Sequence, residues 1–569
     1  MSSIFFIVLR RMRAPLIVLI VIYAVSVLGL TLVPGVDANG QPAPPLSFFH
    51  AFYFISYTAT TIGFGEIPNA FSDAQRLWVT VCIYLTVIGW SYSIVTLLAL
   101  FQDKAFQSVL VVGRFARRVR HLHEPFYLVC GCGETGALVC RTLDELNIRF
   151  VVVEAREERV QELDLEDFKT DVPALAADAQ APKVLQMAGL LHPKCLGVLA
   201  LTNDDNVNLA IAISTRLLNP GLTVLARAEN PMTAANMASF GTHHIINPFE
   251  RFADYLGLAL EAPHTIRLLE WVTGLPGRQM PPMHRPPSGA WVVCGHGRFS
   301  RPVVRELAEH DLQVTVITPE AMDAIAPPLR NVIGLGVRAE TLCEADVAEA
   351  VGLVAGTDND VNNLSIAVTA KAMNPDLFVV LRQNRITNAS LFEAYGAQFT
   401  MVPSRIIAHE SMAMIITPLL ARFLDGVRGR DDDWAAAGCA RMEAQFGDEM
   451  PQVWSVRIDD QEAPALTAHL KDGGAELSIT TRGFELNNEC LDALPLMLVG
   501  SDRVSLSLFP AGNMPLHCGD ELLFAGRGRA RDSQRTLLSN ANILAYLLTG
   551  RERPGGWIWQ EYGKKLDQL

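Results

Sequence analysis

The chain has 569 residues, half of them hydrophobic, and carries a formal net charge of −13 at pH 7. The length allows several domains, and the negative charge argues against a nucleic-acid partner, because phosphate binding requires a basic face. Its ten cysteines have no framework spacing, which is typical of a reducing cytosol rather than of a disulfide scaffold. The long apolar runs lie in the first hundred residues, so we expect a small membrane part joined to a larger soluble part.

Two uncharged runs, residues 14–34 and 77–102, are each long enough to cross a bilayer as a helix. A signal peptide is the alternative for the first run, but the run is long and no Ala-x-Ala cleavage site follows it. Basic residues flank the first run on its N-terminal side and the second on its C-terminal side, which predicts that both chain ends are cytoplasmic. The N-terminal cluster is Arg10, Arg11 and Arg13.

Between the two runs lie an aromatic stretch, residues 47–59, and a segment punctuated by glycines, residues 61–65. The aromatic stretch is too short to span and predicts a re-entrant helix, whose carbonyl end would face a cation. A membrane tolerates non-helical backbone only where it is buried in protein or lines water. A chance glycine-rich turn is the alternative to a pore lining. The predicted filter residues are Thr61, Ile62, Gly63, Phe64 and Gly65.

This segment resembles the potassium-channel filter, in which four TVGYG loops present carbonyl oxygens that replace the hydration shell of the ion. Ile62 stands in place of Val and Phe64 in place of Tyr. The resemblance implies potassium ions in the filter and four copies of the chain around it. Because Phe64 lacks the hydroxyl of a tyrosine, a weakly selective cation channel is the alternative.

A stripe of residues spaced four apart on the second apolar run is the candidate gate. Such residues are expected to share one face of a helix, and a glycine among them is a natural flexing point. If this face lines the pore, four copies of Leu97 form an apolar ring that closes by excluding water. The alternative is that the stripe packs on the outer helix. The stripe consists of Gly89, Ser93, Leu97 and Phe101.

From residue 126 to about 247 the pattern changes to alternating strands and helices, which predicts a parallel α/β sheet. A glycine motif follows the first strand, and Glu154 ends the second strand, where a carboxylate can bind two ribose hydroxyls. A relic turn is the alternative. A dehydrogenase would use the same motif but needs a substrate domain, and none is evident. The predicted nucleotide-binding residues here are Gly131, Cys132, Gly133, Glu134, Thr135, Gly136 and Glu154.

The same design recurs, since Trp291–Gly297 repeats the first strand and turn and Thr357–Leu364 echoes Thr202–Leu209. The second copy is a weaker nucleotide site, because Thr318 stands where the first copy has Glu154. Its predicted residues are Gly295, Gly297 and Ser300. Beyond the second sheet we expect an exposed connection over 422–434, short strands over 453–458, 475–479, 504–509 and 521–524, and one helix from Thr536 into a tail.

The filter, both repeats and the phrase Cys518-Gly519-Asp520-Glu521-Leu522 resemble prokaryotic two-helix potassium channels with tandem RCK (regulator of potassium conductance) domains, of the multi-ligand-gated type. The resemblance implies a cell-membrane homotetramer whose eight cytosolic domains form a gating ring, opened or closed by a ligand. It implies NAD or another adenine nucleotide as that ligand, with Asp178 as a further acidic residue of the first site, and it leaves calcium open. The first domain departs from the family in lacking its own C-lobe.

Two stretches are weaker candidates for metal binding. An oxygen-rich acidic run could hold calcium, but on a helix such a run is more often a solvated face. Cys130 and Cys132, with His243 and His244, could bind a metal, although alternation along a strand explains the cysteines as packing. The acidic run comprises Glu157, Glu158, Glu162, Asp164, Glu166 and Asp167.

The sequence therefore predicts an α-helical pore domain, with two spans, a re-entrant helix and a filter, fused to two Rossmann-like α/β RCK domains and a C-terminal α+β lobe. The expected limits are 1–103 for the pore domain, 104–124 for a linker, 125–273 for the first RCK domain, 274–289 for a second linker, 290–430 for the second RCK domain with its crossover helices, 431–535 for the C-lobe and 536–569 for the tail.

Overall fold

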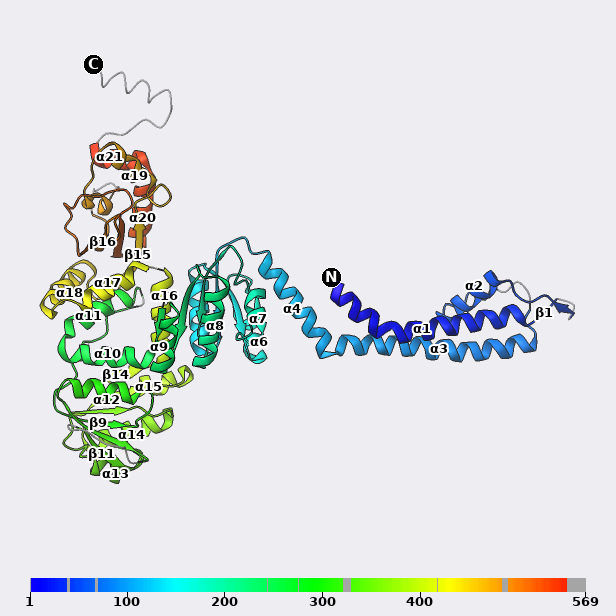
Figure 1. The fold of residues 1–569 in the computed structure, drawn as a ribbon, viewed down its shortest axis with the longest axis horizontal. Coiled ribbons are helices and arrows are strands. Elements are labelled where there is room, and N and C mark those ends of the chain that lie inside the picture. Colours follow the sequence, from blue (N-terminus) through cyan, green and yellow to red (C-terminus); the bar gives the residue numbers. More distant parts are fainter. Residues whose placement is uncertain are drawn as a thin grey trace, which may run out of the picture. The chain divides into compact units, whose positions relative to one another are not determined.

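The computed structural model describes residues 2–37, 41–66, 70–242, 244–274, 276–320, 329–416, 418–483 and 490–549. The chain divides into two compact units, Met1–Leu122 and His123–Leu569. The first unit extends past residue 103, the expected limit of the pore domain, because the helix that follows the second span is part of this unit. Elements are labelled in Figure 1.

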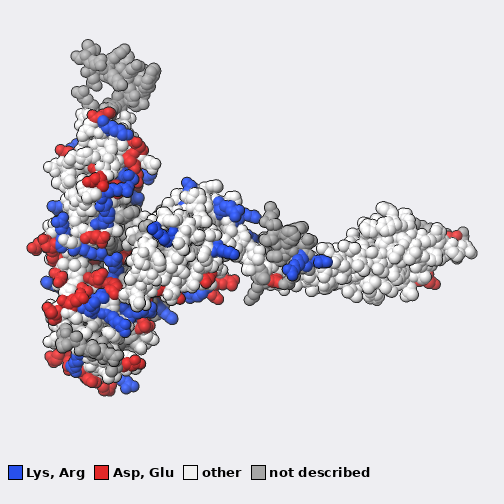
Figure 2. All heavy atoms as spheres, in the orientation of Figure 1, with Lys and Arg blue, Asp and Glu red and all other residues white. Residues whose placement is uncertain are grey.

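The first unit is helical. Two of its helices are long and apolar enough to cross a membrane, over Met12–Leu32 and Asp73–Gln102, as the uncharged runs predicted. Figure 2 shows that the surface over these helices is almost free of charged side chains. The elements are α1 (Ser2–Leu32), a short β1–β2 hairpin (Gly35–Val36 and Pro42–Ala43), α2 (Phe48–Ala59), α3 (Asp73–Gln102) and the basic α4 (Lys104–Arg120).

Polar contacts cap the starts of α2 and α3 and join α3 to α1. The Ser47 hydroxyl caps α2, and Ser72 and Gln75 form a capping box at the start of α3. The Gln75 side chain also donates to the Val33 carbonyl, at 3.0 Å, and the Trp78 indole donates to the Ser26 carbonyl, at 3.2 Å. These bonds join α3 to α1 above an apolar core of Val27, Leu30, Ala51, Phe54, Ile55, Tyr57, Val79 and Cys82.

The second unit contains two parallel six-stranded sheets with the same strand order, β5-β4-β3-β6-β7-β8 and β11-β10-β9-β12-β13-β14. This confirms the predicted repeat. The first sheet comprises β3 (Phe126–Cys130), β4 (Arg149–Glu154), β5 (Ala174–Ala176), β6 (Cys195–Ala200), β7 (Thr223–Arg227) and β8 (His244–Ile246), with α5 (Glu134–Glu145), α6 (Glu157–Leu165), α7 (Pro182–Met187), α8 (Asp205–Leu218) and α9 (Pro231–Ser239). The second comprises β9 (Ala290–Cys294), β10 (Gln313–Thr318), β11 (Leu329–Ile333), β12 (Gly352–Ala355), β13 (Phe378–Arg382) and β14 (Phe399–Met401), with α12 (Ser300–Glu309), α13 (Ala339–Glu344), α14 (Asp360–Met373), η1 (Ile386–Asn388) and α15 (Ala389–Tyr395).

The helices that follow each sheet are exchanged between the two domains. After the first sheet, α10 (Pro248–Glu261) packs Phe249 and Phe252 into the core of the second domain. After the second sheet, α16 (Pro403–Ile416) packs Ile407 and Met412 into the core of the first domain, beside α5. Each is followed by another helix, α11 (Pro263–Thr273) and α17 (Pro418–Arg428). Among the described residues between α11 and β9 there is no further named strand or helix, so the first domain has no C-lobe of its own.

The C-lobe is an antiparallel sheet of order β15-β18-β16-β17, covered by helices. One expected strand, over 475–479, is wrong, because Leu477–Thr481 forms a 3-10 helix. The strand β16 was missed because it is a continuous apolar run rather than an alternating one. The elements are α18 (Asp432–Phe446), β15 (Gln452–Arg457), α19 (Pro464–Asp472), η2 (Leu477–Thr481), β16 (Ala493–Val499), β17 (Leu506–Leu508), β18 (Glu521–Gly526), α20 (Gly528–Ser539) and α21 (Ala541–Thr549).

Two further expectations are corrected. The exposed connection over 422–434 is wrong, because α17 runs to Arg428 and buries Phe423 and Val427, which are spaced four apart on one face. The single helix expected from Thr536 is also wrong, because two helices, α20 and α21, meet at Asn540. Both helices pack into the C-lobe core, so this lobe continues past the expected limit at 535. The Trp-bearing end of the expected tail lies outside the described residues.

Candidate functional site

The filter segment follows directly from the C-terminal end of α2. Thr61, Gly63 and Gly65 have φ angles of 61°, 64° and 74°, while no positive φ occurs at Ile62 or Phe64. Such alternation of handedness turns successive carbonyls toward the same side, and it requires glycine or a strained residue at every second position. The side chains of Ile62 and Phe64 are exposed in the single chain. The backbone of this segment can therefore present a row of oxygens.

The segment is bonded to α2 behind it. The Tyr57 carbonyl accepts hydrogen bonds from the amides of Ile62, at 3.0 Å, and Gly63, at 3.3 Å. The Tyr57 hydroxyl donates to the Glu66 carbonyl at 3.0 Å, and the Tyr53 hydroxyl donates to the Glu66 carboxylate at 3.2 Å. Two phenols of the pore helix therefore hold the residue at which the filter ends.

The four residues of the expected gate stripe differ in exposure within the single chain, and their role as a gate stays a prediction. Gly89 is buried against α1, where an added Cβ would lie 2.7 Å from Cδ1 of Ile22. Ser93 is half-buried, and its hydroxyl donates to the Gly89 carbonyl. Leu97 is 38% exposed and Phe101 is 55% exposed. A spacing of four residues advances about 40° around a helix at each step, so the stripe winds gradually around α3.

The first glycine turn is built for a close approach to a ligand. Gly131 has φ 92° and packs on Thr202, and a Cβ at Gly136 would lie 2.1 Å from the Gly131 carbonyl oxygen. A Cβ at Gly133, in contrast, would meet nothing within 4 Å. Gly133 is the N-cap residue of α5, and because it has no side chain it cannot cap the helix with one. The start of α5 is therefore not capped by a side chain, and there is open space beside it at Gly133; a helix N-terminus of this kind can bind phosphate.

Glu154 lies at the same turn. It is buried at the end of β4, and its carboxylate accepts hydrogen bonds from the amides of Cys132, at 2.6 Å, and Arg156, at 3.1 Å. Asp178 lies two residues beyond β5, the strand that pairs with β4, and is exposed. The structure therefore places Glu154 beside the glycine turn and Asp178 just beyond the end of the neighbouring strand β5, both at the carboxyl edge of the sheet, where ligands bind in such sheets. Thr135 is buried within α5.

The second glycine turn repeats the backbone but not the acidic groups. Gly295 has φ 101°, and Gly297 faces open space. Ser300 is fully buried, and its hydroxyl donates to the Gly356 carbonyl at 3.4 Å. Thr318 occupies the position of Glu154, and its hydroxyl contacts Glu320 and Asn331 rather than the glycine turn. No carboxylate of β10 therefore faces this turn.

Contacts between the two domains involve both glycine turns, and the sequence reasoning missed them. Arg298, in the second turn, lies 2.6 Å from the carboxylate of Glu229, which also pairs with Arg227. Glu134, in the first turn, accepts the amide of Ile386 in the second domain, at 3.3 Å. Glu134 and Arg298 occupy equivalent positions of the repeat. That equivalence is visible in the sequence, but nothing in it identifies the partners.

The weaker metal candidates receive no support. In the acidic run, Glu162 pairs with Arg159 and Glu166 pairs with Arg141. Within the part of the chain that the structure describes, no group of three His, Cys, Asp or Glu side chains is placed to hold a metal. Cys130 and Cys132 are buried in apolar packing, and His243 lies outside the described residues.

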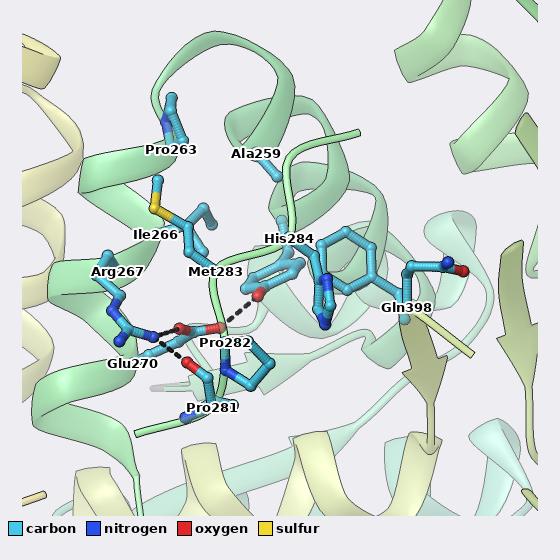
Figure 3. A pocket seen from close by; sticks show the side chains of 12 residues that line it. Ala259, Pro263, Ile266, Arg267, Glu270, Pro281, Pro282, Met283, His284 and Gln398 are labelled. Carbon is cyan, nitrogen blue, oxygen red and sulfur yellow. Dashed lines mark hydrogen bonds and ion pairs between the residues drawn. The ribbon is translucent and has the colours of Figure 1, made fainter. Parts of the chain in front are cut away.

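A small cavity of about 110 Å³ lies between α10, α11 and the segment that leads to the second domain (Figure 3). The Tyr255 hydroxyl donates to Glu270 at 2.7 Å, and Arg267 binds both Glu270 and the Pro281 carbonyl. Burial raises the pKa of Glu270 above its ordinary value. The cavity is smaller than the usual ligand pocket of about 300–1,000 Å³. We therefore interpret these contacts as structural: through Arg267 they attach the segment around Pro281, which leads to the second domain, to α11.

Comparison with known proteins agrees with the interpretation of the first unit as a pore domain and of the second as two repeated α/β domains. The ion channel family model matches residues 16–103, and the TrkA-N domain model matches 127–248 and 291–403. Potassium channel protein 1 of Methanocaldococcus jannaschii is 26% identical over 203 residues, which are 36% of this chain and 59% of that protein. Probable potassium channel protein 2 of the same organism is 24% identical over 226 residues, 40% of this chain and 64% of that protein.

Among solved structures, the GsuK channel covers 94% of this chain and 98% of its own, at 16% identity and a TM-score of 0.44. GsuK bound to NAD covers 94% and 100%, at 15% identity and a TM-score of 0.43. The family models, together with the two channel relatives, confirm the resemblance inferred from the sequence. The chain joins an ion-channel pore domain to two TrkA-N domains, which is the architecture of a two-helix potassium channel with RCK domains.

Proposed function

We propose that the chain is one subunit of a potassium-selective channel whose opening is controlled by an adenine nucleotide bound to the first TrkA-N domain. The observation that carries the proposal is the alternation of positive φ at Thr61, Gly63 and Gly65, directly after a re-entrant helix and between two apolar spans. Selectivity resides in backbone carbonyls, which Ile62 and Phe64 supply as well as the commoner residues do.

Four copies are needed to surround one pore with such segments, so the proposed assembly is a homotetramer in the cell membrane. Two cytosolic domains from each of four chains would supply the eight domains of a gating ring. The basic face of α4, with Arg114, Arg117, Arg118 and Arg120 after the second span, supports a cytoplasmic position for the soluble unit. Each chain end then lies in the cytoplasm.

The proposed ligand is NAD or another adenine nucleotide, such as ADP, at the first glycine turn. The uncapped start of α5, the open space at Gly133 and the carboxylates of Glu154 and Asp178 support this site. GsuK, the structural neighbour, has been solved with NAD and with ADP. The second domain, without a carboxylate at Thr318, is proposed to bind nucleotide more weakly. Calcium is the second ligand to be tested.

Reversal potentials of the reconstituted channel in a bi-ionic gradient of potassium and sodium test the proposed selectivity. A potential displaced toward the potassium equilibrium value is expected. A potential near zero would favour the second candidate, a weakly selective cation channel, to which the missing hydroxyl of Phe64 points. Calorimetric titration of the purified protein with NAD, ADP, ATP and calcium, one at a time, tests the ligand. A protein that binds none of the four would contradict nucleotide gating.

A further inference from the structure

Tyr57, on the pore helix α2, contacts the filter segment at three points. Its carbonyl accepts the amides of Ile62 and Gly63, at 3.0 and 3.3 Å. Its hydroxyl donates to the Glu66 carbonyl at 3.0 Å, and its ring meets the Phe64 ring edge-on, with centroids 6.0 Å apart. One residue therefore bonds the backbone near both ends of the segment and packs against its middle.

The phenol of Tyr57 is itself held in place. The residue is 5% exposed and belongs to the core that joins α1, α2 and α3. The rings of Tyr53 and Phe54 each pack edge-on against it, with centroids 5.3 Å away. Because the ring is enclosed on several sides, its rotation is restricted, and its hydroxyl is directed at the Glu66 carbonyl.

The bond from the Tyr57 hydroxyl to the Glu66 carbonyl matters because residue 64 is a phenylalanine. A tyrosine at that position could donate a hydroxyl to support the filter, and Phe64 cannot. We propose that Tyr57 takes over this task as a specificity-determining positioning residue, and that its hydroxyl holds the outer end of the filter at the width that suits potassium. The inference rests on the proposed function of residues 61–65 as a potassium filter. Without the bond, the carbonyls of the segment relax and discriminate less between potassium and sodium.

Tyr53 supplies a matched control on the same helix, one turn earlier. Its hydroxyl also reaches Glu66, but it binds the side-chain carboxylate at 3.2 Å rather than the backbone. The substitutions Tyr57→Phe and Tyr53→Phe each remove one hydroxyl and leave the ring in place, so neither opens a cavity in the core. Only Tyr57→Phe removes a bond to the backbone of the filter segment.

Bi-ionic reversal potentials of the full-length channel in planar bilayers are the primary test. Tyr57→Phe is expected to lower the potassium-to-sodium permeability ratio about tenfold, which is about 1.4 kcal/mol at 25 °C and matches the loss of one hydrogen bond. Tyr53→Phe is expected to change the ratio by less than about twofold, because the backbone bond persists. An unchanged ratio in Tyr57→Phe, beside a selective natural channel, overturns the inference. A natural channel without selectivity instead overturns the proposed function.

Potassium-dependent stability gives a second measurement that requires no current. A ligand that binds only the folded state raises the thermal midpoint, so potassium bound in the filter should raise it more than sodium does. Tyr57→Phe protein is expected to lose most of this difference between the two ions, while Tyr53→Phe protein keeps it. A Tyr57→Phe protein that retains the full difference contradicts the assigned role, even if that variant carries no measurable current.

Discussion

Arg298 of the second domain forms an ion pair with Glu229 of the first, with 2.6 Å between the guanidinium and the carboxylate. Glu134, at the equivalent position of the first glycine turn, accepts an amide from the second domain in return. Each turn is thus tied to the opposite domain. The proposed ligand, if it displaced the first turn, would act directly on the contact between the domains, and by linkage the state of that contact would alter ligand affinity.

The Glu229 carboxylate is 6% exposed and pairs with Arg227, whose side chain is 10% exposed, and with Arg298, whose side chain is 60% exposed. We expect Arg227→Met to lower the free energy of unfolding by about 3 kcal/mol, because it breaks a buried pair. Arg298→Met should cost less than about 1 kcal/mol, because that partner is exposed. Chemical unfolding followed by tryptophan fluorescence compares the two. Equal losses would show that burial of the Arg227–Glu229 pair does not set its energy.

Two alanine substitutions in the first glycine turn separate ligand binding from stability. Gly133→Ala adds a methyl group where nothing lies within 4 Å, so we expect unchanged thermal stability and weaker nucleotide binding. Gly136→Ala drives its methyl group to 2.1 Å from a backbone oxygen, so we expect a lower thermal midpoint. Calorimetric titration and thermal scans of both variants check this. If Gly133→Ala binds nucleotide normally, the ligand does not approach through this opening.

Glu154→Gln removes the charge and keeps one oxygen acceptor, which can accept from the amide of Cys132 or of Arg156 but not from both. Since a charged hydrogen bond to ribose contributes about 1.5–3 kcal/mol, we expect affinity for the nucleotide to fall roughly tenfold to a hundredfold. Because linkage is reciprocal, the same variant should also shift channel opening. Thr318→Val, at the equivalent position of the second domain, is the control and should change affinity little. Unchanged affinity in Glu154→Gln protein would rule out the ribose role.

Leu97 and Leu98 are neighbouring exposed residues of α3 that point about 100° apart. If Leu97 forms the apolar ring of the gate, Leu97→Asp introduces four carboxylates that hydrate the ring and repel one another. We therefore expect Leu97→Asp channels to stay open without ligand and Leu98→Asp channels to behave normally. Single-channel recording decides. A Leu97→Asp channel that remains shut, or a Leu98→Asp channel that remains open, places the constriction elsewhere on the helix.

Asp432 caps the start of α11 from the neighbouring helix α18, accepting the amides of His264 and Thr265 at 2.9 Å each. Burial alone raises the pKa of this carboxyl, but the bonds from His264 and Thr265 lower it overall. Because the folded pKa lies below the unfolded one, the stabilisation is present above about pH 4 and disappears as the pH falls through the folded pKa.

We accordingly expect Asp432→Asn to lower the free energy of unfolding by about 1 kcal/mol at pH 7, with a difference that vanishes as the pH falls below about 4. Thermal scans from pH 3 to pH 7 measure it. Asp433→Asn, at the exposed neighbouring residue, should show no such dependence. A deficit in Asp432→Asn that persists unchanged at pH 3 would mean that the charge of the carboxylate contributes nothing.

The features that the sequence predicted are those with a local physical signature. Uncharged runs gave the spans, and strand–turn–helix patterns gave both sheets, because backbone periodicity and glycine placement act within a few residues. The same holds for Glu154, which ends its strand at the expected place beside the turn. The filter glycines, with positive φ at Gly63 and Gly65, follow from the same reasoning.

What the sequence could not supply depends on tertiary packing. The bond from the Tyr57 hydroxyl to the Glu66 backbone carbonyl and the ion pair of Arg298 with Glu229 follow no periodic sequence pattern, because packing decides which groups meet. The gate stripe stays a prediction for a related reason: spacing alone does not say which face of α3 meets α1, and in the structure Gly89 packs against Ile22 of α1. In the C-lobe, β16 escaped detection because it is buried on both faces and does not alternate.

The exchange of α10 and α16 between the domains has a consequence for how the protein is made. Val139 and Leu143 of α5 share an apolar core with Ile407 and Met412, which are translated more than 250 residues later. During synthesis the first domain therefore lacks part of its apolar core until α16 has left the ribosome. Any message cut short before α16 yields a chain whose first domain cannot be completed.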